Sequence, residues 1–219
     1  MPSRTWKFSE ALSRGFVELL GRPPFPRELE AFSRYLWLLL QWNQAHRLTG
    51  YRTPAEITER LLLDSLLFRR WINRGDRKLL DLGAGAGIPG IPLKIIEPSL
   101  EITLLEGRRR QSSFLATVVR ELGLEGIEVR WGRAEELLDR EPVLRAVFDV
   151  VVTRAAGPLK SIVPLALAYL APGGRLIASG PPAGKTFPTL PRSVPHRWES
   201  LPGRIGGTPR RFLVAEKVD

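Results

Sequence analysis

A set of closely spaced glycines follows directly on a short apolar segment that contains one acid. The segment is Lys78–Leu82, the acid is Asp81, and the glycines are Gly83, Gly85, Gly87 and Gly90. An apolar run that breaks into glycines predicts a buried parallel strand turning sharply into a helix, because glycine tolerates the required dihedrals and lets a ligand touch the backbone. Adenosine cofactors bind at turns of this kind. We therefore expect a site for an adenosine cofactor at this turn.

The glycines fit two different cofactor patterns. Residues 85–90 match the dinucleotide fingerprint G-x-G-x-x-G, and Glu106 lies about 20 residues further on, where an acid would bind a ribose. Residues 81–87 instead resemble the D-x-G-x-G-x-G pattern of class I S-adenosylmethionine methyltransferases, in which Glu106 would again bind the ribose hydroxyls. We favour the second pattern, because its first glycine, Gly83, follows the strand directly and Asp81 then lies near the charged methionine end of the cofactor. A glycine turn without a ligand is less favoured, since each glycine costs conformational entropy.

The elements around this turn alternate between apolar strands and helices. Predicted strands cover Leu79–Leu82, Ile102–Leu105, Ile127–Trp131, Phe148–Val152, Arg175–Ala178 and Phe212–Ala215. Predicted helices cover Pro89–Ile96, Arg108–Leu122 and Leu159–Leu170, and a turn at Leu170–Gly174 precedes the next strand. This alternation predicts a doubly wound parallel α/β sheet, which binds its ligands at the carboxyl ends of the strands.

The chain before this alternation is predicted to be helical. Apolar residues recur at helical spacing from Thr5 to about Trp71, and Gly21–Pro24 ends the first helix. We therefore divide the chain into a helical N-terminal region, 1–74, and an α/β domain, 75–219, whose last part is rich in Pro and Gly.

The composition excludes several kinds of site and favours one class of partner. Cysteine is absent, which excludes a disulfide framework, a thiolate metal site and a cysteine nucleophile. The net charge is +10 at pH 7, with 33 basic and 23 acidic side chains, and this favours a polyanionic partner such as nucleic acid. An arginine-rich genomic composition is the competing explanation. No segment has the character of a membrane span or a signal peptide, so we expect a cytoplasmic protein with no membrane partner.

Several motifs occur in a characteristic order along nearly the whole chain. They are Trp42-Asn43 with Leu48-Thr49, Leu63-Asp64-Ser65-Leu66, Leu80–Leu93, Leu104-Leu105-Glu106 with Phe114-Leu115, Gly132-Arg133-Ala134-Glu135, and Thr153-Arg154-Ala155. Their order and spacing resemble the bacterial family of ribosomal RNA small subunit methyltransferase G, also called glucose-inhibited division protein B. The resemblance implies a Rossmann-like class I S-adenosylmethionine-dependent methyltransferase fold with an N-terminal helical extension.

The resemblance also implies a reaction and a substrate. The family methylates N7 of guanine 527, in the 530 loop of 16S rRNA, so the implied partner is 16S rRNA or the small ribosomal subunit. By the family's pattern Gly83, Ile88, Ala134, Glu135 and Arg154 contact S-adenosylmethionine. With the glycine pattern added, the expected cofactor-binding residues are Asp81, Gly83, Gly85, Gly87, Ile88, Glu106, Ala134, Glu135 and Arg154.

Methyl transfer to guanine N7 needs little from the protein beyond alignment. The donor is a sulfonium and N7 carries a lone pair without a proton, so the reaction needs an approach of roughly 3–3.5 Å and no general base. We therefore expect no catalytic acid or base and no metal. His46 and His196, the two histidines, lack the spacing of a metal-binding or catalytic pair.

Arginines are the expected positioning residues. Arg154 follows the predicted fourth strand, where it would bind the methionine carboxylate, a phosphate or guanine O6. Arg108, Arg109 and Arg110 open a predicted helix near the same crevice and are candidate contacts to RNA phosphates. A solvated surface run is the competing interpretation of these three.

The chain departs from the usual pattern of the family at several positions. His46-Arg47 replaces an asparagine before Leu48-Thr49, Leu61 stands where a histidine is frequent, Glu106 replaces an aspartate, and Ser179-Gly180 replaces Lys-Gly. These changes bear on RNA engagement and leave the cofactor motifs intact. Two alternatives stay open: a class I methyltransferase acting on another RNA, a small molecule or a protein, and a nucleotide-binding regulator without catalysis.

Overall fold

The strands form one seven-stranded sheet in the order β3-β2-β1-β4-β5-β7-β6. The computed structural model describes residues 2–154, 156–181, 190–191, 193–202 and 209–218. The strands are β1 (Lys78–Leu82), β2 (Glu101–Glu106), β3 (Ile127–Trp131), β4 (Phe148–Thr153), β5 (Leu170–Ser179), β6 (His196–Leu201) and β7 (Arg210–Glu216). Strands β1 to β5 pair in parallel, whereas β7 is antiparallel to both β5 and β6. The predicted doubly wound sheet is confirmed, with an antiparallel pair at one edge.

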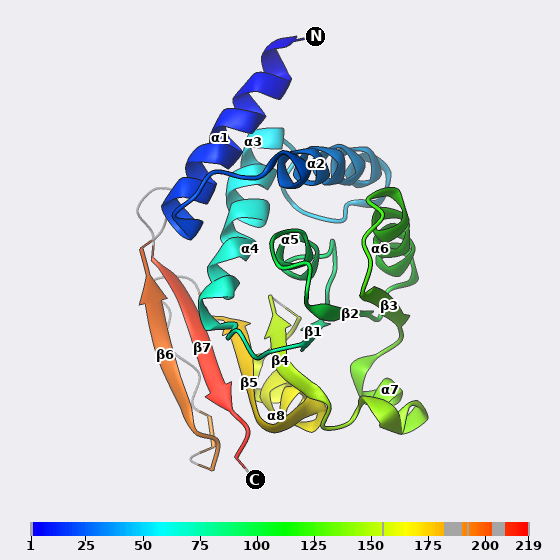
Figure 1. Ribbon diagram of the computed structural model, residues 1–219. Helices are drawn as coiled ribbons and strands as arrows, with labels where there is room; N and C mark the ends of the chain where they lie inside the picture. Colours follow the sequence, from blue (N-terminus) through cyan, green and yellow to red (C-terminus); the bar gives the residue numbers. More distant parts are fainter. Residues whose placement is uncertain (1, 155, 182–189, 192, 203–208, 219) are drawn as a thin grey trace.

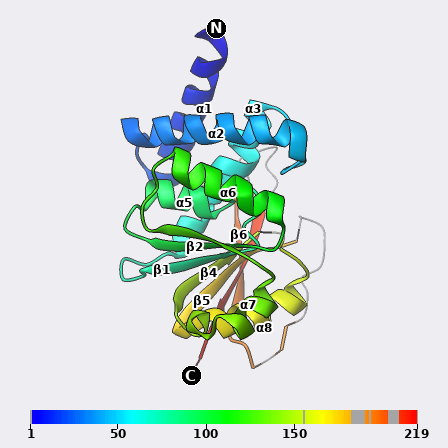
Figure 2. The ribbon, with the colours of Figure 1, turned by 90° about the vertical axis from the view of Figure 1, so that its right-hand side faces the viewer.

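Helices cover both faces of the sheet (Figure 1). The helical segments are α1 (Pro2–Leu20), α2 (Pro26–His46), α3 (Pro54–Ile57), η1 (Thr58–Leu63), α4 (Asp64–Leu66), η2 (Leu67–Trp71), α5 (Gly90–Ile96), α6 (Arg109–Glu121), α7 (Ala134–Arg140), η3 (Pro142–Leu144) and α8 (Leu159–Tyr169). Figure 2 shows α5 and α6 above the sheet with α2 above them, and α7 and α8 below it. The predicted helical N-terminal region is confirmed.

Side chains of the central strands alternate between two apolar cores. Leu79 packs on the side of α5 and α6, whereas its neighbour Leu80 packs on the side of α7 and α8. Val150 and Val151 of β4 divide between the cores in the same way. Because successive side chains of a strand point to opposite faces, a strand that is buried on both faces must be apolar at nearly every position. This explains the unbroken apolar runs from which the strands are predicted.

The N-terminal helices share the first of these cores with the sheet. The ring of Phe68 in η2 meets that of Phe212 in β7 edge to face, with centroids 5.1 Å apart. A Cβ added to Gly15 of α1 would lie 2.4 Å from a methyl carbon of Leu63 in η1, so a larger residue there would displace the Leu63 side chain. One continuous core thus joins the regions 1–74 and 75–219, and the boundary between them stays a prediction.

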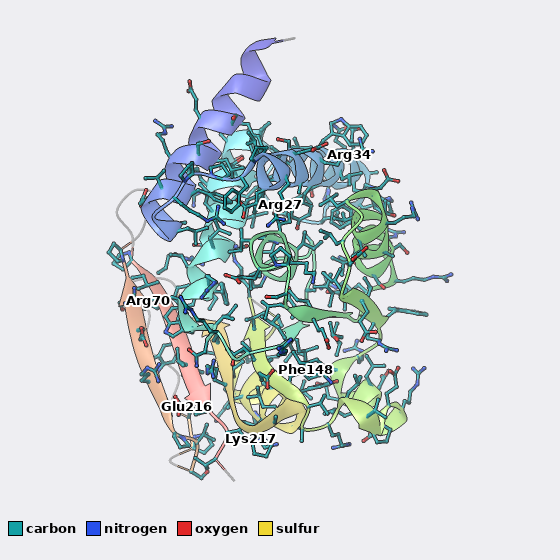
Figure 3. All side chains as sticks on the ribbon, viewed as in Figure 1. Arg27, Arg34, Arg70, Phe148, Glu216 and Lys217 are labelled. Carbon is teal, nitrogen blue, oxygen red and sulfur yellow. The ribbon has the colours of Figure 1, made fainter. Side chains whose placement is uncertain are left out.

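Side-chain contacts hold together the end of β7, the starts of β4 and β5, and the end of α8. Figure 3 places Glu216 and Lys217 at the end of β7 and Phe148 at the start of β4. The Lys217 ammonium donates to the carbonyl oxygen of Leu170 over 2.7 Å. The Phe148 ring packs 6.1 Å from that of Tyr169 at the end of α8. These contacts fix the end of the sheet opposite the predicted ligand site.

The structure differs from the predicted elements in three places. The turn predicted at Leu170–Gly174 belongs to β5, which pairs irregularly with β4 between Phe148 and Val150. Strand β6 was not predicted, because an edge strand with polar residues such as Glu199 lacks the apolar run of a buried strand. The short helix α7 was not predicted either. Part of the segment rich in Pro and Gly, and Ala155 of the last motif, lie outside the described residues.

Candidate cofactor and RNA-binding site

A crevice of about 470 Å³ opens at the carboxyl ends of the central strands. The chain runs outward from β1 through β2 to β3, then returns to place β4 on the other side of β1, so the strand order reverses between β1 and β4. Ligands of doubly wound sheets bind at such a reversal. The crevice is lined by Leu48, Leu82, Gly83, Gly85, Leu105, Glu106, Gly107, Arg108, Gln111, Gly132, Arg133, Ala134, Glu135, Arg154, Ala156, Ile162 and Leu165.

The first two glycines of the turn face this crevice. Gly83 and Gly85 both have positive φ angles, of +74° and +57°, which disfavour any residue with a side chain. A Cβ on Gly83 would lie 2.6 Å from that of Ala156. A Cβ on Gly85 would meet no protein atom closer than 3.9 Å, so the space beside Gly85 is open to a ligand.

The later glycines of the turn pack against protein instead. A Cβ on Gly87 would lie 2.4 Å from the Ile91 side chain, and one on Gly90 would lie 2.5 Å from Leu104. Ile88 is buried between them in the apolar core. Gly87, Ile88 and Gly90 are not among the residues that line the crevice. The two crevice-facing glycines are thus those of the D-x-G-x-G pattern, and the last glycine of the dinucleotide pattern packs against protein.

Asp81 lies beneath the turn and not in the crevice. Its side chain is completely buried, and Oδ2 accepts a hydrogen bond of 2.7 Å from the backbone N–H of Gly90. The other oxygen, Oδ1, is buried without a hydrogen-bond partner in the described structure. Burial raises the pKa of this carboxyl to about 7; the Gly90 hydrogen bond lowers it, and the negative charge of Glu106 raises it further. The carboxyl therefore ties β1 to the start of α5.

A side chain of the N-terminal helices reaches the same turn. The hydroxyl of Tyr35 in α2, completely buried, donates to the carbonyl oxygen of Ala86 over 2.5 Å. This contact joins residues 51 positions apart in the sequence. The turn is therefore held from α2 as well as from the sheet.

Glu106 ends β2 directly beside the turn. Its Oε2 accepts from the N–H of Gly85 and its Oε1 from the N–H of Arg108, both over 2.8 Å. The side chain is 7% exposed and lines the crevice. Each carboxylate oxygen can accept a second hydrogen bond, so Glu106 both shapes the turn and presents acceptors to a ligand.

Arg154 lines the crevice just beyond the end of β4. Asp64 lies 3.3 Å from its Nη2 and also pairs with Arg210 of β7 at 2.7 Å. Arg154 Nη2 donates to the carbonyl oxygen of Arg60 over 2.6 Å, whereas Nη1 is buried and has no partner among the described residues. Burial lowers the pKa of Arg154 while Asp64 raises it, and an arginine in this setting stays charged. Asp64 is therefore a contact between the helical region and the sheet.

Two further expected residues lie at the start of α7. Ala134 and Glu135 both line the crevice, and the carbonyl oxygen of Ala134 accepts from the buried hydroxyl of Tyr169 over 2.7 Å. This hydrogen bond fixes the first turn of α7 to α8 across the lower core. Glu135 is exposed, so its carboxylate is free to turn toward a ligand or toward solvent.

The predicted RNA-contact arginines divide between the crevice and its rim. Arg108 lines the crevice, and Arg109 lies 5.7 Å from the ring centroid of Trp131. Arg110 is exposed in the first turn of α6. Trp131, at the end of β3, is 56% exposed. Basic and aromatic groups therefore stand together beside the crevice.

Several crevice residues were missed from the sequence. Gly132 and Arg133 stand in the motif that contains Ala134, so their position there was a signal that could have been used. Gly107 and Gln111 flank the arginine run. Leu48 stands in the motif with Thr49, which was likewise a signal, whereas nothing in the local pattern of Ile162 and Leu165 points to a ligand.

Comparison with known proteins identifies the family. A sequence model of "rRNA small subunit methyltransferase G" matches residues 28–180. The chain belongs to this family. The ribosomal RNA small subunit methyltransferase G of Anaeromyxobacter dehalogenans is 42% identical over 173 residues, which are 78% of this chain and 77% of that protein. That of Halorhodospira halophila is 37% identical over 190 residues, which are 85% of this chain and 87% of that protein.

The solved structures show the fold of this methyltransferase G family member. Cofactor-bound Rv0187 from MTB superposes with a TM-score of 0.56 at 16% identity, covering 90% of this chain and all (100%) of that one. TYW2 of P. horikoshii, solved in complex with MeSAdo, superposes with a TM-score of 0.52 at 14% identity, covering 75% and 63% of the two chains. The predicted class I methyltransferase fold is confirmed.

Two kinds of feature are absent from the described residues. Among them, no helix has the length and apolar character needed to cross a membrane. No group of three or more His, Cys, Asp and Glu side chains in the described part of this methyltransferase G family member has the arrangement of a metal site.

Proposed function

We propose that this family member transfers a methyl group from S-adenosylmethionine to N7 of guanine 527 in the 530 loop of 16S rRNA, acting in the cytoplasm. The observation that carries the proposal is the crevice at the reversal of strand order. There Gly83, Gly85, Glu106 and Arg154 meet from three different strand ends. A glycine turn lets an adenosine cofactor approach the backbone, an acid can bind its ribose hydroxyls, and a guanidinium can bind the carboxylate of its amino-acid tail.

The crevice residues fit S-adenosylmethionine. Each carboxylate oxygen of Glu106 accepts one backbone hydrogen bond and can accept another, so Glu106 would also bind the ribose hydroxyls. Arg154 Nη1, a buried donor without a partner in the described structure, would hold the methionine carboxylate. The open space beside Gly85 would let the cofactor lie against the backbone.

The residues of the crevice suit a reaction that moves no proton at the acceptor. S-adenosylmethionine supplies a methyl group activated by a positively charged sulfur. The carboxylates among the described lining residues are Glu106 and Glu135, and Glu106 already accepts from two backbone N–H groups. The protein would therefore align the guanine and stabilise charge, which is what attack by the N7 lone pair needs.

The rim would position the RNA. Arg108, Arg109 and Arg110 are placed to neutralise phosphates beside the crevice, and the exposed ring of Trp131 offers a stacking surface to an unpaired base. Arg109, already close to that ring, would add its charge to the same position.

The test uses small ribosomal subunits that lack the methyl group at guanine 527. The purified protein and labelled S-adenosylmethionine should place one methyl group on N7 of that guanine, as mapped by primer extension after cleavage at 7-methylguanosine. With cofactor and subunits saturating, the single-turnover rate should show no ionisation of an essential base between about pH 6 and 9.

Three other results would each contradict part of this proposal. Labelling at another nucleotide would refute the position. A rate that rises with deprotonation of one group would refute N7 as the acceptor and indicate an amine or hydroxyl. Binding of S-adenosylmethionine with no transfer to subunits would favour a regulator, or an acceptor of another class.

A further inference from the structure

A second cavity, of about 530 Å³, lies next to the cofactor crevice and belongs to none of the site described above. It lies between the last turns of α2 and the residues that follow them. Its lining consists of Leu40, Asn43, Gln44, Arg47, Thr49, Gly50 and Arg52. The volume lies in the range of small-molecule sites, roughly 300–1,000 Å³, and suffices for one nucleotide unit.

The loop that forms one wall of this cavity, residues 47–52, is held in a defined shape. Asn43 of α2 accepts from the N–H of Thr49 and donates to the carbonyl oxygen of Tyr51, both over 2.8 Å. Arg47 caps α2 in the left-handed region, with φ of 47°, which turns the chain back on the helix. The cavity is therefore pre-formed and does not depend on a bound ligand for its walls.

The charge of the cavity is positive. Arg47 and Arg52 are exposed, and neither guanidinium has a hydrogen bond or ion pair within the described residues. No described lining residue is acidic. Glu56, the nearest acid along the chain, uses its carboxylate to cap α3 through Thr53. The C-terminus of α2 adds roughly −0.5 of a charge, which the two guanidiniums outweigh.

The cavity shares a wall with the cofactor crevice. Leu48 lines the crevice, while its two neighbours, Arg47 and Thr49, line the cavity. Consecutive residues of one loop thus face the two spaces. Arg60, whose carbonyl oxygen accepts from Arg154, also lies with its guanidinium 5.7 Å from the ring of Tyr51 in the same loop.

We propose that this cavity binds a phosphodiester of the substrate RNA adjacent to the guanine that enters the crevice. The inference rests on the proposed function, because it assigns the occupant from the neighbouring crevice. Two unpaired guanidiniums, an amide, a hydroxyl and an open glycine backbone form a donor set for phosphate and ribose oxygens. A strand whose target base enters the crevice must continue past the residues that line it, and Leu48 of the 47–52 loop is one of them.

The test compares three variants in equilibrium binding to unmethylated small subunits, with S-adenosylhomocysteine in place of the reactive cofactor. Arg47→Gln/Arg52→Gln removes both charges and keeps side-chain length, and Arg47→Lys/Arg52→Lys keeps them. Arg77→Gln removes one exposed arginine at the opposite end of the sheet, just before β1. All of these positions are exposed, and affinity for S-adenosylhomocysteine verifies that each variant is folded.

The glutamine pair should weaken subunit binding at least about tenfold at moderate salt. Its slope of log affinity against log salt should fall by roughly 0.7 to 0.9 for each phosphate that the protein no longer neutralises. The lysine pair should keep most of the slope, and Arg77→Gln should match the unaltered protein. Affinity and slope unchanged in the glutamine pair would overturn the proposal, as would an equal loss in the lysine pair.

Failure of the proposed function would look different from failure of this inference. A protein that binds subunits but leaves guanine 527 unmethylated would refute the reaction, because this binding assay needs no transfer. If the glutamine pair still lost affinity in that protein, the cavity would stand as an RNA phosphate site.

Discussion

Replacing Asp81 by asparagine should make the protein more stable at high pH. The side chain is completely buried in β1, and burial raises its pKa from 3.8 to about 7. A charge at this position is therefore costly, although Gly90 donates one hydrogen bond to it. Asparagine keeps an oxygen acceptor for Gly90 and cannot ionise, so it mimics the protonated acid in size and charge.

The sign and size follow from the pKa difference. Because the folded-state pKa of Asp81 lies above the unfolded one, the folded protein retains a proton that the unfolded chain releases. The free energy of unfolding is highest, as far as Asp81 is concerned, below about pH 4, where the carboxyl is protonated in both states. This contribution is lost as the pH rises through 7. A difference of about three units, at roughly 1.36 kcal/mol each, corresponds to about 4 kcal/mol. The free energy of unfolding of the variant, relative to that of the unaltered protein, should therefore increase by up to about 4 kcal/mol between pH 4 and pH 8.

Urea unfolding of both proteins at several pH values between 4 and 8, without cofactor, measures this difference. Titration of the groups that do not interact with Asp81 cancels when the two free energies of unfolding are subtracted. Asp139→Asn is the matched control, because the Asp139 side chain is 81% exposed and its replacement should change little. A difference between Asp81→Asn and the unaltered protein that does not grow with pH would refute the reasoning.

Substitutions at three further positions test the crevice. Gly85→Ala should abolish S-adenosylmethionine binding in calorimetry while costing roughly 1–2 kcal/mol of stability, because its Cβ meets no nearby protein atom but occupies ligand space; retained affinity would remove Gly85 from the site. Glu106→Gln should lower both cofactor affinity and stability by about 1–3 kcal/mol, since glutamine has one oxygen and its amide nitrogen cannot accept from the second backbone N–H; thermal melts with and without cofactor separate the effect on affinity from the effect on stability. Arg154→Lys should restore little of the single-turnover rate lost in Arg154→Ala, because one ammonium cannot meet Asp64, the Arg60 carbonyl and a cofactor together; a rate near that of the unaltered protein in Arg154→Ala would exclude Arg154 from the site.

The sequence determines most of the elements of the sheet and the glycine turn. Apolar runs identify β1 and β4, because a strand covered on both faces is apolar at nearly every position. The glycines at 83 and 85 identify the turn, because their positive φ angles are a local backbone requirement. Glu106 could be placed beside them from its position at the end of the next strand, since parallel neighbours end at the same edge of the sheet.

Only the tertiary structure assigns the roles of the polar residues. From the sequence, Asp81 was expected near the methionine end of the cofactor, yet its carboxyl turns inward to Gly90. Side-chain periodicity indicates which face of a strand a residue occupies and not how deep it lies beneath a turn.

The contacts that complete the site join residues far apart in the chain. Arg154 meets the Arg60 carbonyl across 94 positions, and Arg210 meets Asp64 across 146. The cavity beside the crevice likewise depends on Asn43 holding the loop that follows α2. No local pattern encodes such partners, because burial and hydrogen bonding between distant residues are settled only when the helices pack on the sheet.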